Sequence, residues 1–177
     1  LSYQKSFNEL HNLDALVGYE IDNQSRDYLM AYVKNFARPD KPEISNGVKL
    51  DNAGGSGNGT RLVSYISRVN YNYDNKYYLG ASYRMDGSSR LHRDNRWGSF
   101  WSVSGAWKVS SESFMEPATA WLSDLKLRLS YGVNGTLPSD YYGYMGLSSL
   151  TSNYNDEPGI SQSQLRNLDL SWETNYN

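Results

Sequence analysis

Apolar and polar side chains alternate along three successive runs between residues 60 and 109. Successive side chains of a β-strand point to opposite faces, so this period of two predicts strands with two chemically different faces. The solvent that each face meets then decides what the protein does. The apolar sides carry Val63, Tyr65, Val69, Tyr71 and Tyr73, then Tyr77, Leu79, Ala81, Tyr83 and Met85, and then Trp101, Val103, Trp107 and Val109.

Three further segments, 11–20, 123–134 and 167–175, show the same alternation. The segment 123–134 is the most regular, and in 167–175 the residues Leu168, Leu170 and Trp172 alternate with polar ones. We therefore expect an all-β chain of about six antiparallel strands in an up-and-down meander. The apolar side of 123–134 carries Leu125, Leu127, Leu129, Tyr131 and Val133, against Lys126, Arg128, Ser130, Gly132 and Asn134.

Two of the connections between these strands are short. Residues 74–76 (Asp-Asn-Lys) predict a tight hairpin turn. In the connection 110–122, Ser111 or Ser113 is placed to cap a short helical turn before Pro117. Both connections join strands at the same side of the expected meander.

The other connections are longer. Residues 21–59 and 135–166 are long and 86–98 is intermediate, so the order along the chain is long, short, intermediate, short, long. This order is typical of up-and-down outer-membrane barrels, which have short turns on the periplasmic side and longer loops outside. Within 21–59, the spacing of apolar residues predicts a small helix at 27–36, and the glycines of 54–59 predict a flexible loop.

The aromatic residues favour a membrane–water boundary. The chain has 16 Tyr and 5 Trp but only 4 Phe, and Tyr and Trp combine an apolar ring with a polar tip. Strands of about ten residues match a tilted membrane crossing. The alternative is a soluble β-sandwich whose rings fill its core or bind sugar. Two belts are expected at opposite strand ends, with Tyr71, Tyr73, Tyr77 and Tyr78 at one and Trp97, Phe100 and Trp101 at the other.

Enzyme, metal and cofactor signatures are absent from the sequence. The net charge of −2 argues against a nucleic-acid partner, and the lack of cysteine excludes disulfides and thiolate ligands. His11 and His92 are the only histidines and lie far apart in sequence. The carboxylates of Asp86 and Glu112 are expected at opposite rims of a barrel. We therefore expect neither catalysis nor a cofactor.

Three blocks of the sequence resemble the barrel of SusC/RagA-type TonB-linked outer-membrane proteins of Bacteroidetes. The first is YYLGASYRMDGSSR at 77–90, followed by NRWG, FWSVSGAW and ESFM up to residue 115. The others are LRLSYGVNGT at 127–136 and LSWETN at 170–175. The run LVGYE at 16–20 is similar to strand endings of the same family.

The resemblance implies a barrel of about 22 strands that holds a plug. It implies a Gram-negative outer-membrane protein that imports oligosaccharides or peptides, with energy from the TonB–ExbB–ExbD complex and with a SusD-like surface lipoprotein as partner. Six strands are too few to close a membrane barrel, and an open edge in lipid leaves unpaired backbone groups. Residues 1–177 are therefore expected to be a barrel segment without the plug or the TonB-contacting region.

Two groups of residues are candidates for binding. One strand face would meet outer-membrane lipid and the other the lumen, where polar side chains hydrogen-bond a hydrophilic solute, grip the plug or are simply hydrated. Tyrosines of the last long loop would stack on sugar rings, or pack against neighbouring loops. The lumen-facing candidates are Arg68, Asn70, Ser82, Arg84, Lys126, Arg128 and Ser130, and the loop candidates are Tyr141, Tyr142, Tyr144 and Tyr154.

Three functions remain open at this point. A transporter segment predicts one continuous sheet whose apolar sides all point the same way. A soluble or surface carbohydrate-binding β-sandwich predicts that the same apolar sides are buried against each other. An outer-membrane adhesin or channel without TonB coupling shares the sheet with the transporter and differs only in lacking a plug.

Overall fold

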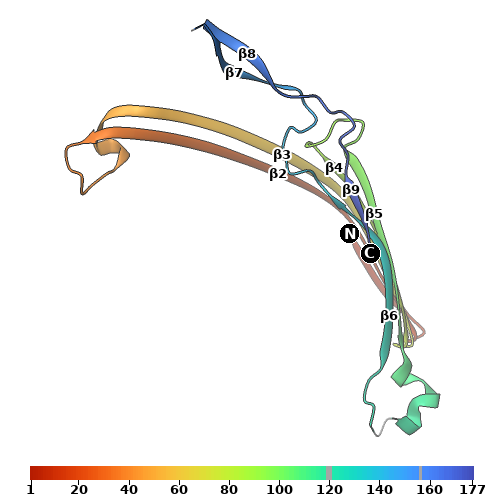
Figure 1. The fold of residues 1–177 in the computed structure, drawn as a ribbon. Coiled ribbons are helices and arrows are strands. Elements are labelled where there is room, and N and C mark those ends of the chain that lie inside the picture. The colour runs from red at the N-terminus through yellow and green to blue at the C-terminus, as the bar shows by residue number, and fades with distance from the viewer. Residues whose placement is uncertain (119–120, 156) are drawn as a thin grey trace. The chain divides into compact units, whose positions relative to one another are not determined.

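The computed structural model describes residues 1–118, 121–155 and 157–177 and is an all-β antiparallel meander (Figure 1), as the sequence predicts. Seven of the described strands form one sheet in the order β1-β2-β3-β4-β5-β6-β9. Each strand therefore pairs with its neighbours in sequence, apart from the small sheet inserted before β9. The strands are β1 (Ser2–Phe7), β2 (His11–Phe36), β3 (Gly47–Tyr73), β4 (Tyr77–Ser88), β5 (Trp97–Lys108), β6 (Lys126–Thr136) and β9 (Glu173–Tyr176).

The remaining elements lie in the connections. β7 (Leu147–Tyr154) and β8 (Glu157–Gln164) form a separate two-stranded sheet. Short 3-10 helices occupy η1 (Ile44–Asn46), η2 (Val109–Ser111) and η3 (Ser113–Ala118). The helical turn predicted near Pro117 is present as η3, with Pro117 inside it.

The register places the apolar sides of neighbouring strands on one face of the sheet. Val69 is opposite Ala81, Ala81 is opposite Val103, and Val103 is opposite Tyr131. One residue further along each strand, Arg68, Ser82, Ser102 and Gly132 are opposite one another in the same way. Because paired residues point to the same side, the sheet has an apolar face and a polar face.

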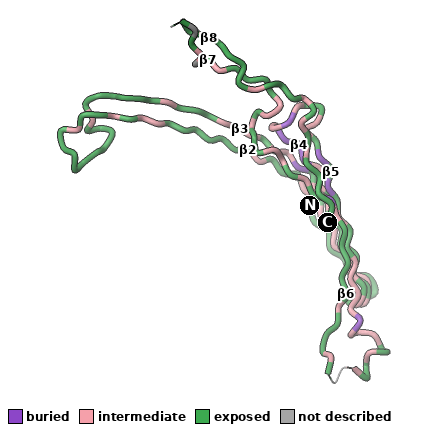
Figure 2. The backbone as a smooth tube through the Cα atoms, in the orientation of Figure 1, coloured by how far each residue is buried: buried purple, intermediate pink, exposed green. Residues whose placement is uncertain are grey.

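The apolar face has no partner layer among the described residues. Leu79 is 62% exposed and Leu129 is 81% exposed, and few residues are buried anywhere along the described backbone (Figure 2). A β-sandwich would bury this face against a second sheet. Such exposure of large apolar side chains is typical of a surface that contacts a membrane or another protein.

The chain divides into two compact units, and the second comprises Asn23–Thr60. Here β2 and β3 continue as paired strands, so the helix predicted at 27–36 and the flexible glycine loop predicted at 54–59 are both wrong. A Cβ on Gly55 would lie 3.1 Å from the Tyr28 carbonyl oxygen, so the glycines bring two backbones close together. None of residues 23–60 is buried, so no core restricts the apolar side chains to one face of these strands. The apolar residues of 27–36 therefore have a spacing that resembles a helix face.

The first and last strands also differ from the prediction. β1 was not expected, yet it pairs with β2 from Ser2 opposite Leu16 to Phe7 opposite His11. The last strand contains only Glu173–Tyr176, so 167–172 is not a strand. Trp172 leaves the expected alternation because its indole N–H donates to the Arg96 carbonyl oxygen at 2.9 Å.

Candidate functional site: two faces of a barrel wall

Aromatic side chains form two rows across the apolar face. At the end of the strands that carries the 74–76 turn, Tyr73 and Tyr77 have ring centroids 6.2 Å apart, and Tyr77 stacks on Trp107 at 6.4 Å. We call Tyr73, Tyr77 and Trp107 the turn-side row. At the opposite end, Tyr19, Tyr65 and Trp97 are linked by centroid distances of 5.2 and 6.0 Å and form the loop-side row.

The separation of the two rows matches a bilayer. Tyr77 pairs with Trp107 and Gly87 pairs with Trp97, so the two rows are ten residue steps apart along β4. At about 3.3 Å per residue this is about 33 Å along the strand. A strand tilt of about 40° reduces it to about 25 Å, which is the height of the apolar band of outer-membrane barrels.

Two aromatic residues expected in the belts lie on the polar face instead. Phe100 is almost fully buried and meets the Trp172 ring at a centroid distance of 5.1 Å. Lys126 Nζ lies 3.6 Å from the centroid of the Tyr78 ring. Both residues have even numbers, whereas the apolar side of their strands consists of odd-numbered residues. The alternation in the sequence therefore already assigns both residues to the polar face.

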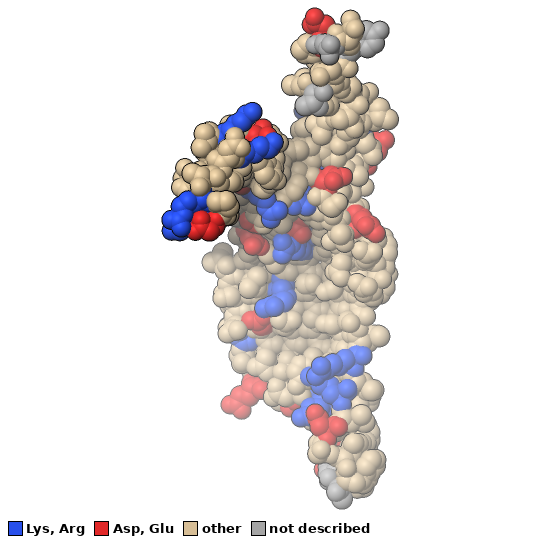
Figure 3. Space-filling model, turned by 60° about the vertical axis from the view of Figure 1, so that its left-hand side comes forward, with Lys and Arg blue, Asp and Glu red and all other residues tan. Residues whose placement is uncertain are grey.

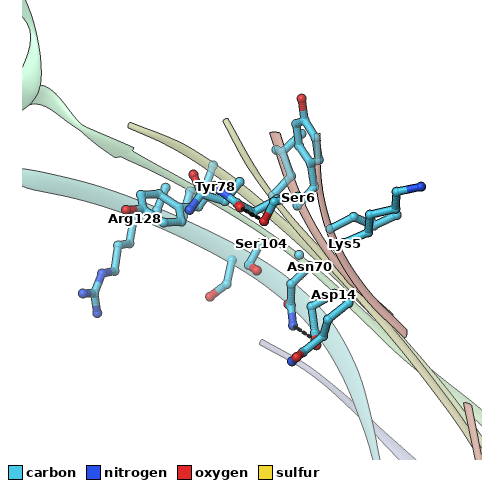
Figure 4. Close-up of a pocket in the computed structure, with 18 residues that line it drawn as sticks. Lys5, Ser6, Asp14, Asn70, Tyr78, Ser104 and Arg128 are labelled. Carbon is cyan, nitrogen blue, oxygen red and sulfur yellow. Dashed lines mark hydrogen bonds between the residues drawn. The ribbon is translucent and has the colours of Figure 1, made fainter. Parts of the chain in front are cut away.

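A hollow of about 640 Å³ lies against the turn-side half of the sheet (Figure 4). Asp14 accepts hydrogen bonds from Gln4 Nε2 at 2.9 Å and from Asn70 Nδ2 at 3.2 Å. Of the seven lumen-facing candidates, Asn70, Arg128 and Ser130 line this hollow. The polar side chains among its lining residues carry amides, hydroxyls, the Asp14 carboxylate, the Lys5 ammonium and the Arg128 guanidinium, which suit a hydrophilic solute or another polar surface.

The remaining lumen-facing candidates lie outside the hollow's lining. Arg68 is exposed on the polar face, opposite Ser82 in the register. The Ser82 hydroxyl lies 2.7 Å from the Ser102 hydroxyl across β4 and β5. Lys126 is opposite Lys108 in the register. The seven candidates thus share one face, but only three of them gather in one place.

Arg84 is hydrogen-bonded to other side chains of the protein. Its Nε donates to both carboxylate oxygens of Asp86, at 2.7 and 2.8 Å, and its Nη2 donates to the Ser64 hydroxyl at 3.0 Å. The Glu20 carboxylate lies 3.9 Å from the same Nη2. Asp86 and Ser64, both buried, were missed as partners, although residues two apart in a strand share a face. This group therefore holds β3 and β4 together.

The loop tyrosines pack against the β4–β5 connection. The Arg90 guanidinium lies 4.6 Å from the Tyr141 ring centroid, and its Nη1 donates to the Pro138 carbonyl oxygen at 3.3 Å. Tyr142 lies 6.4 Å from the Tyr141 ring, and Tyr144 lies 6.0 Å from the His92 ring. The side chain of the fourth candidate, Tyr154, falls outside the described residues.

The Glu112 carboxylate binds two side chains of the turn-side row. Glu112 accepts a hydrogen bond from the Tyr77 hydroxyl at 2.6 Å and another from the Trp107 indole N–H at 3.0 Å. These two hydrogen bonds, the first the stronger, hold the pKa of the Glu112 carboxyl below its ordinary value. No signal in the sequence predicts this contact, because it joins three separate elements.

Metal and charge patterns add no further site within the described ranges. No group of three or more His, Asp and Glu residues there has a geometry suited to a metal ion. Among the described helices, none is both long and apolar enough to span a membrane. On the face seen in Figure 3, basic and acidic side chains lie side by side, without a broad surface of one sign.

Comparison with known proteins identifies the family. The chain is 33% identical over 175 residues to the TonB-dependent receptor P39 of Formosa agariphila, which covers 97% of this chain. It is 39% identical over 119 residues to the TonB-dependent receptor SusC of Bacteroides thetaiotaomicron. The RagAB peptide transporter superposes on 99% of this chain with a TM-score of 0.86 and 32% identity. The chain belongs to the SusC/RagA-type TonB-dependent receptors.

Members of this family are outer-membrane transport proteins and not enzymes. Because the sheet matches part of the RagAB structure, it is a section of a SusC/RagA-type barrel wall. The chain spans 17% of the length of receptor P39, 12% of SusC and 20% of the matched RagAB chain. No family model matches the sequence. The resemblance to SusC/RagA proteins expected from the strand motifs is confirmed.

Proposed function

We propose that the complete protein imports a large hydrophilic solute across the outer membrane, with the polar face of this sheet lining the lumen. The observation that carries the proposal is the single sheet with two unlike faces. One face bears exposed apolar side chains between two aromatic rows, and the other bears amides, hydroxyls and charges. The match to the RagAB peptide transporter over nearly the whole chain supports it.

The solute we propose is an oligosaccharide or a peptide. The hollow on the polar face offers side chains such as Asn70, Arg128 and Ser130, which hydrogen-bond sugar hydroxyls and peptide groups alike. The RagAB protein is described as a peptide transporter, and this favours peptides over oligosaccharides. We propose that the loop tyrosines Tyr141, Tyr142 and Tyr144 supply apolar ring faces for either class.

Uptake by cells that carry the full-length protein tests this proposal. Labelled oligopeptides and oligosaccharides are supplied to a deletion strain complemented with the wild type or with Arg128→Ala. We expect uptake of one class to depend on the protein and to fall in the variant, while a matched variant on the lipid face outside the hollow's lining, Leu127→Ala, keeps wild-type uptake. If neither class depends on the protein, the proposed function is wrong.

We further propose that the hairpin unit 23–60 contacts a SusD-like surface lipoprotein. A two-stranded hairpin is marginally stable in water by itself, and Tyr28, Leu29 and Tyr32 are all exposed in it. The name RagAB supports a two-component assembly for the matched protein. Replacing the three side chains by serine is expected to reduce copurification of the lipoprotein, with Lys34→Ser as the matched control.

The energy source and the plug belong to the same proposal. We place residues 1–177 entirely in the barrel wall, with the plug and the segment that engages TonB–ExbB–ExbD elsewhere in the polypeptide. Uptake that stops when TonB is deleted would support this arrangement. Uptake that continues without TonB would favour a channel or adhesin with the same wall.

A further inference from the structure

Hydrogen bonds join the two ends of the connection between β5 and β6. We define the turn-side segment as residues 109–118 and 121–125. The Ser110 backbone N–H donates to the Leu125 carbonyl oxygen at 3.2 Å, and the Ser110 hydroxyl donates to Asp124 Oδ1 at 2.9 Å. Met115 N–H donates to the Glu112 carbonyl oxygen at 3.0 Å, so η3 continues this order. The segment therefore has a defined position at the rim of the sheet.

The turn-side segment docks on the apolar face and not on the polar one. Glu112 is held by Tyr77 and Trp107, which both belong to the turn-side row. The Phe114 ring meets the Trp107 ring edge-on at a centroid distance of 6.4 Å. Phe114 thus extends the turn-side row beyond the end of the strands, on the side of the sheet that faces lipid.

Two large aromatic side chains of this segment are exposed. Phe114 is 62% exposed and Trp121 is 77% exposed. Trp121 N–H and Leu122 N–H both donate to the Ala118 carbonyl oxygen, at 3.2 and 2.9 Å. Two exposed rings of this size present apolar area to whatever surrounds the rim.

The charged groups of this segment and of the 74–76 turn fit the headgroup level of a bilayer. The Glu112 carboxylate lies within the segment, and Lys76 in the neighbouring turn forms an ion pair with Asp74 at 3.1 Å. Charged groups are costly in the hydrocarbon region and are accommodated at its boundary, where Trp also concentrates. A segment that carries both a charged group and exposed aromatic rings suits that boundary.

We propose that the turn-side segment is an interfacial anchor, in which Phe114 and Trp121 insert into the periplasmic leaflet of the outer membrane beside the barrel. The occupant of this apolar surface is phospholipid, because the surface continues directly from the lipid-facing turn-side row. The inference rests on the outer-membrane location of the family and is independent of which solute is transported. It assigns this connection a membrane-binding role beyond joining two strands.

Depth-dependent fluorescence quenching tests the proposal. The full-length protein, with any cysteine elsewhere in the polypeptide replaced by serine, carries Phe114→Cys or Trp121→Cys labelled with a nitrobenzoxadiazole group. It is reconstituted in vesicles of phosphatidylethanolamine and phosphatidylglycerol that contain a nitroxide either near the headgroup or at the acyl-chain end. Val103→Cys on the apolar face and Ser139→Cys in an exposed loop are the deep and aqueous controls.

We expect both labels to emit at shorter wavelength than the Ser139 label and to be quenched more by the headgroup-level nitroxide than by the chain-end nitroxide. The Val103 label should show the opposite order. Quenching by iodide to the level of the Ser139 label, or insensitivity to both iodide and nitroxide, would overturn the proposal. The second result would mean that protein covers the rings.

A further variant reports the position of the segment without removing either aromatic ring. Ser113→Cys is exposed and leaves both Phe114 and Trp121 in place, so it reports the position of the segment if the ring variants fail to fold. A folded barrel is recognised by its heat-modifiable migration in cold detergent gels. A Ser113 label that is quenched only by iodide in the folded protein also counts against the anchor.

Discussion

An arginine placed at increasing depth on the apolar face tests the membrane assignment directly. Val103 lies four residues from Trp107 of the turn-side row, which is about 13 Å along the strand and about 10 Å in depth at a tilt of about 40°. Val103 is therefore close to the middle of the 25 Å band, about as deep as a side chain of this sheet can lie. Leu127 is opposite Trp107 in the register, so it lies at the boundary.

The expected costs follow from these depths. Val103→Arg should reduce the free energy of unfolding by about 2–4 kcal/mol, whereas Leu127→Arg should cost about 0–1 kcal/mol. Leu129, two residues deeper than Leu127, should fall between them. The measurement is a urea titration of folding into phospholipid vesicles, followed by heat-modifiable migration in cold detergent gels.

The opposite face supplies the matched control. Ser130 lies between Leu129 and Tyr131 in β6, at nearly the same depth, but belongs to the polar face. Ser130→Arg should cost much less than Leu129→Arg, because its guanidinium points away from lipid. Equal costs at Ser130 and Leu129, or at Leu127 and Val103, would refute the assignment of faces and of depth.

Three further outcomes are expected. Asp86→Ala leaves the Arg84 guanidinium without its main acceptor and should cost about 1–3 kcal/mol in urea unfolding; the double variant with Arg84→Ala should cost less than the sum of the single variants. Gly135→Ala would drive a Cβ into the Phe100 ring and should cost about 1–3 kcal/mol, detectable as a lower unfolding midpoint. The hydrogen bonds that lower the pKa of Glu112 stabilise the folded state above the ordinary glutamate pKa, and this stabilisation is lost as the pH falls through the lower pKa of the folded state. A titration of the unfolding midpoint against pH should therefore show a smaller acid-dependent loss in Glu112→Gln than in the wild type.

Much of the sheet was predictable because strand alternation is a local property of the sequence. The runs through Val69, Ala81, Val103 and Tyr131 assign each residue to a face without knowledge of its partners, and the structure aligns those same faces across four strands. The order of short and long connections in the same way indicates which strand ends lie together. Family resemblance in the central strands then identifies the kind of barrel.

The long hairpin shows where local pattern fails. Tyr28, Leu29 and Tyr32 have the spacing of a helix face, yet they lie in a strand paired with the glycine-rich part of β3. A hairpin without a core has apolar residues on both of its faces. Apolar and polar residues then no longer alternate along the strand, and the period of two that predicts a strand disappears. Only pairing between segments distant in sequence decides the structure there.

The sequence by itself determined the central strands, their two unlike faces and the family, because each depends on neighbours within a few residues. Only the tertiary structure decided which polar side chains are hydrogen-bonded to other groups of the protein. It showed that Arg84 is bound by Asp86, that Trp172 donates to Arg96, and that Glu112 joins Tyr77 and Trp107. The contacts of Trp172 and Glu112 join residues from different elements, and hydrogen bonds of this kind form only where folding brings a donor and an acceptor within about 3 Å.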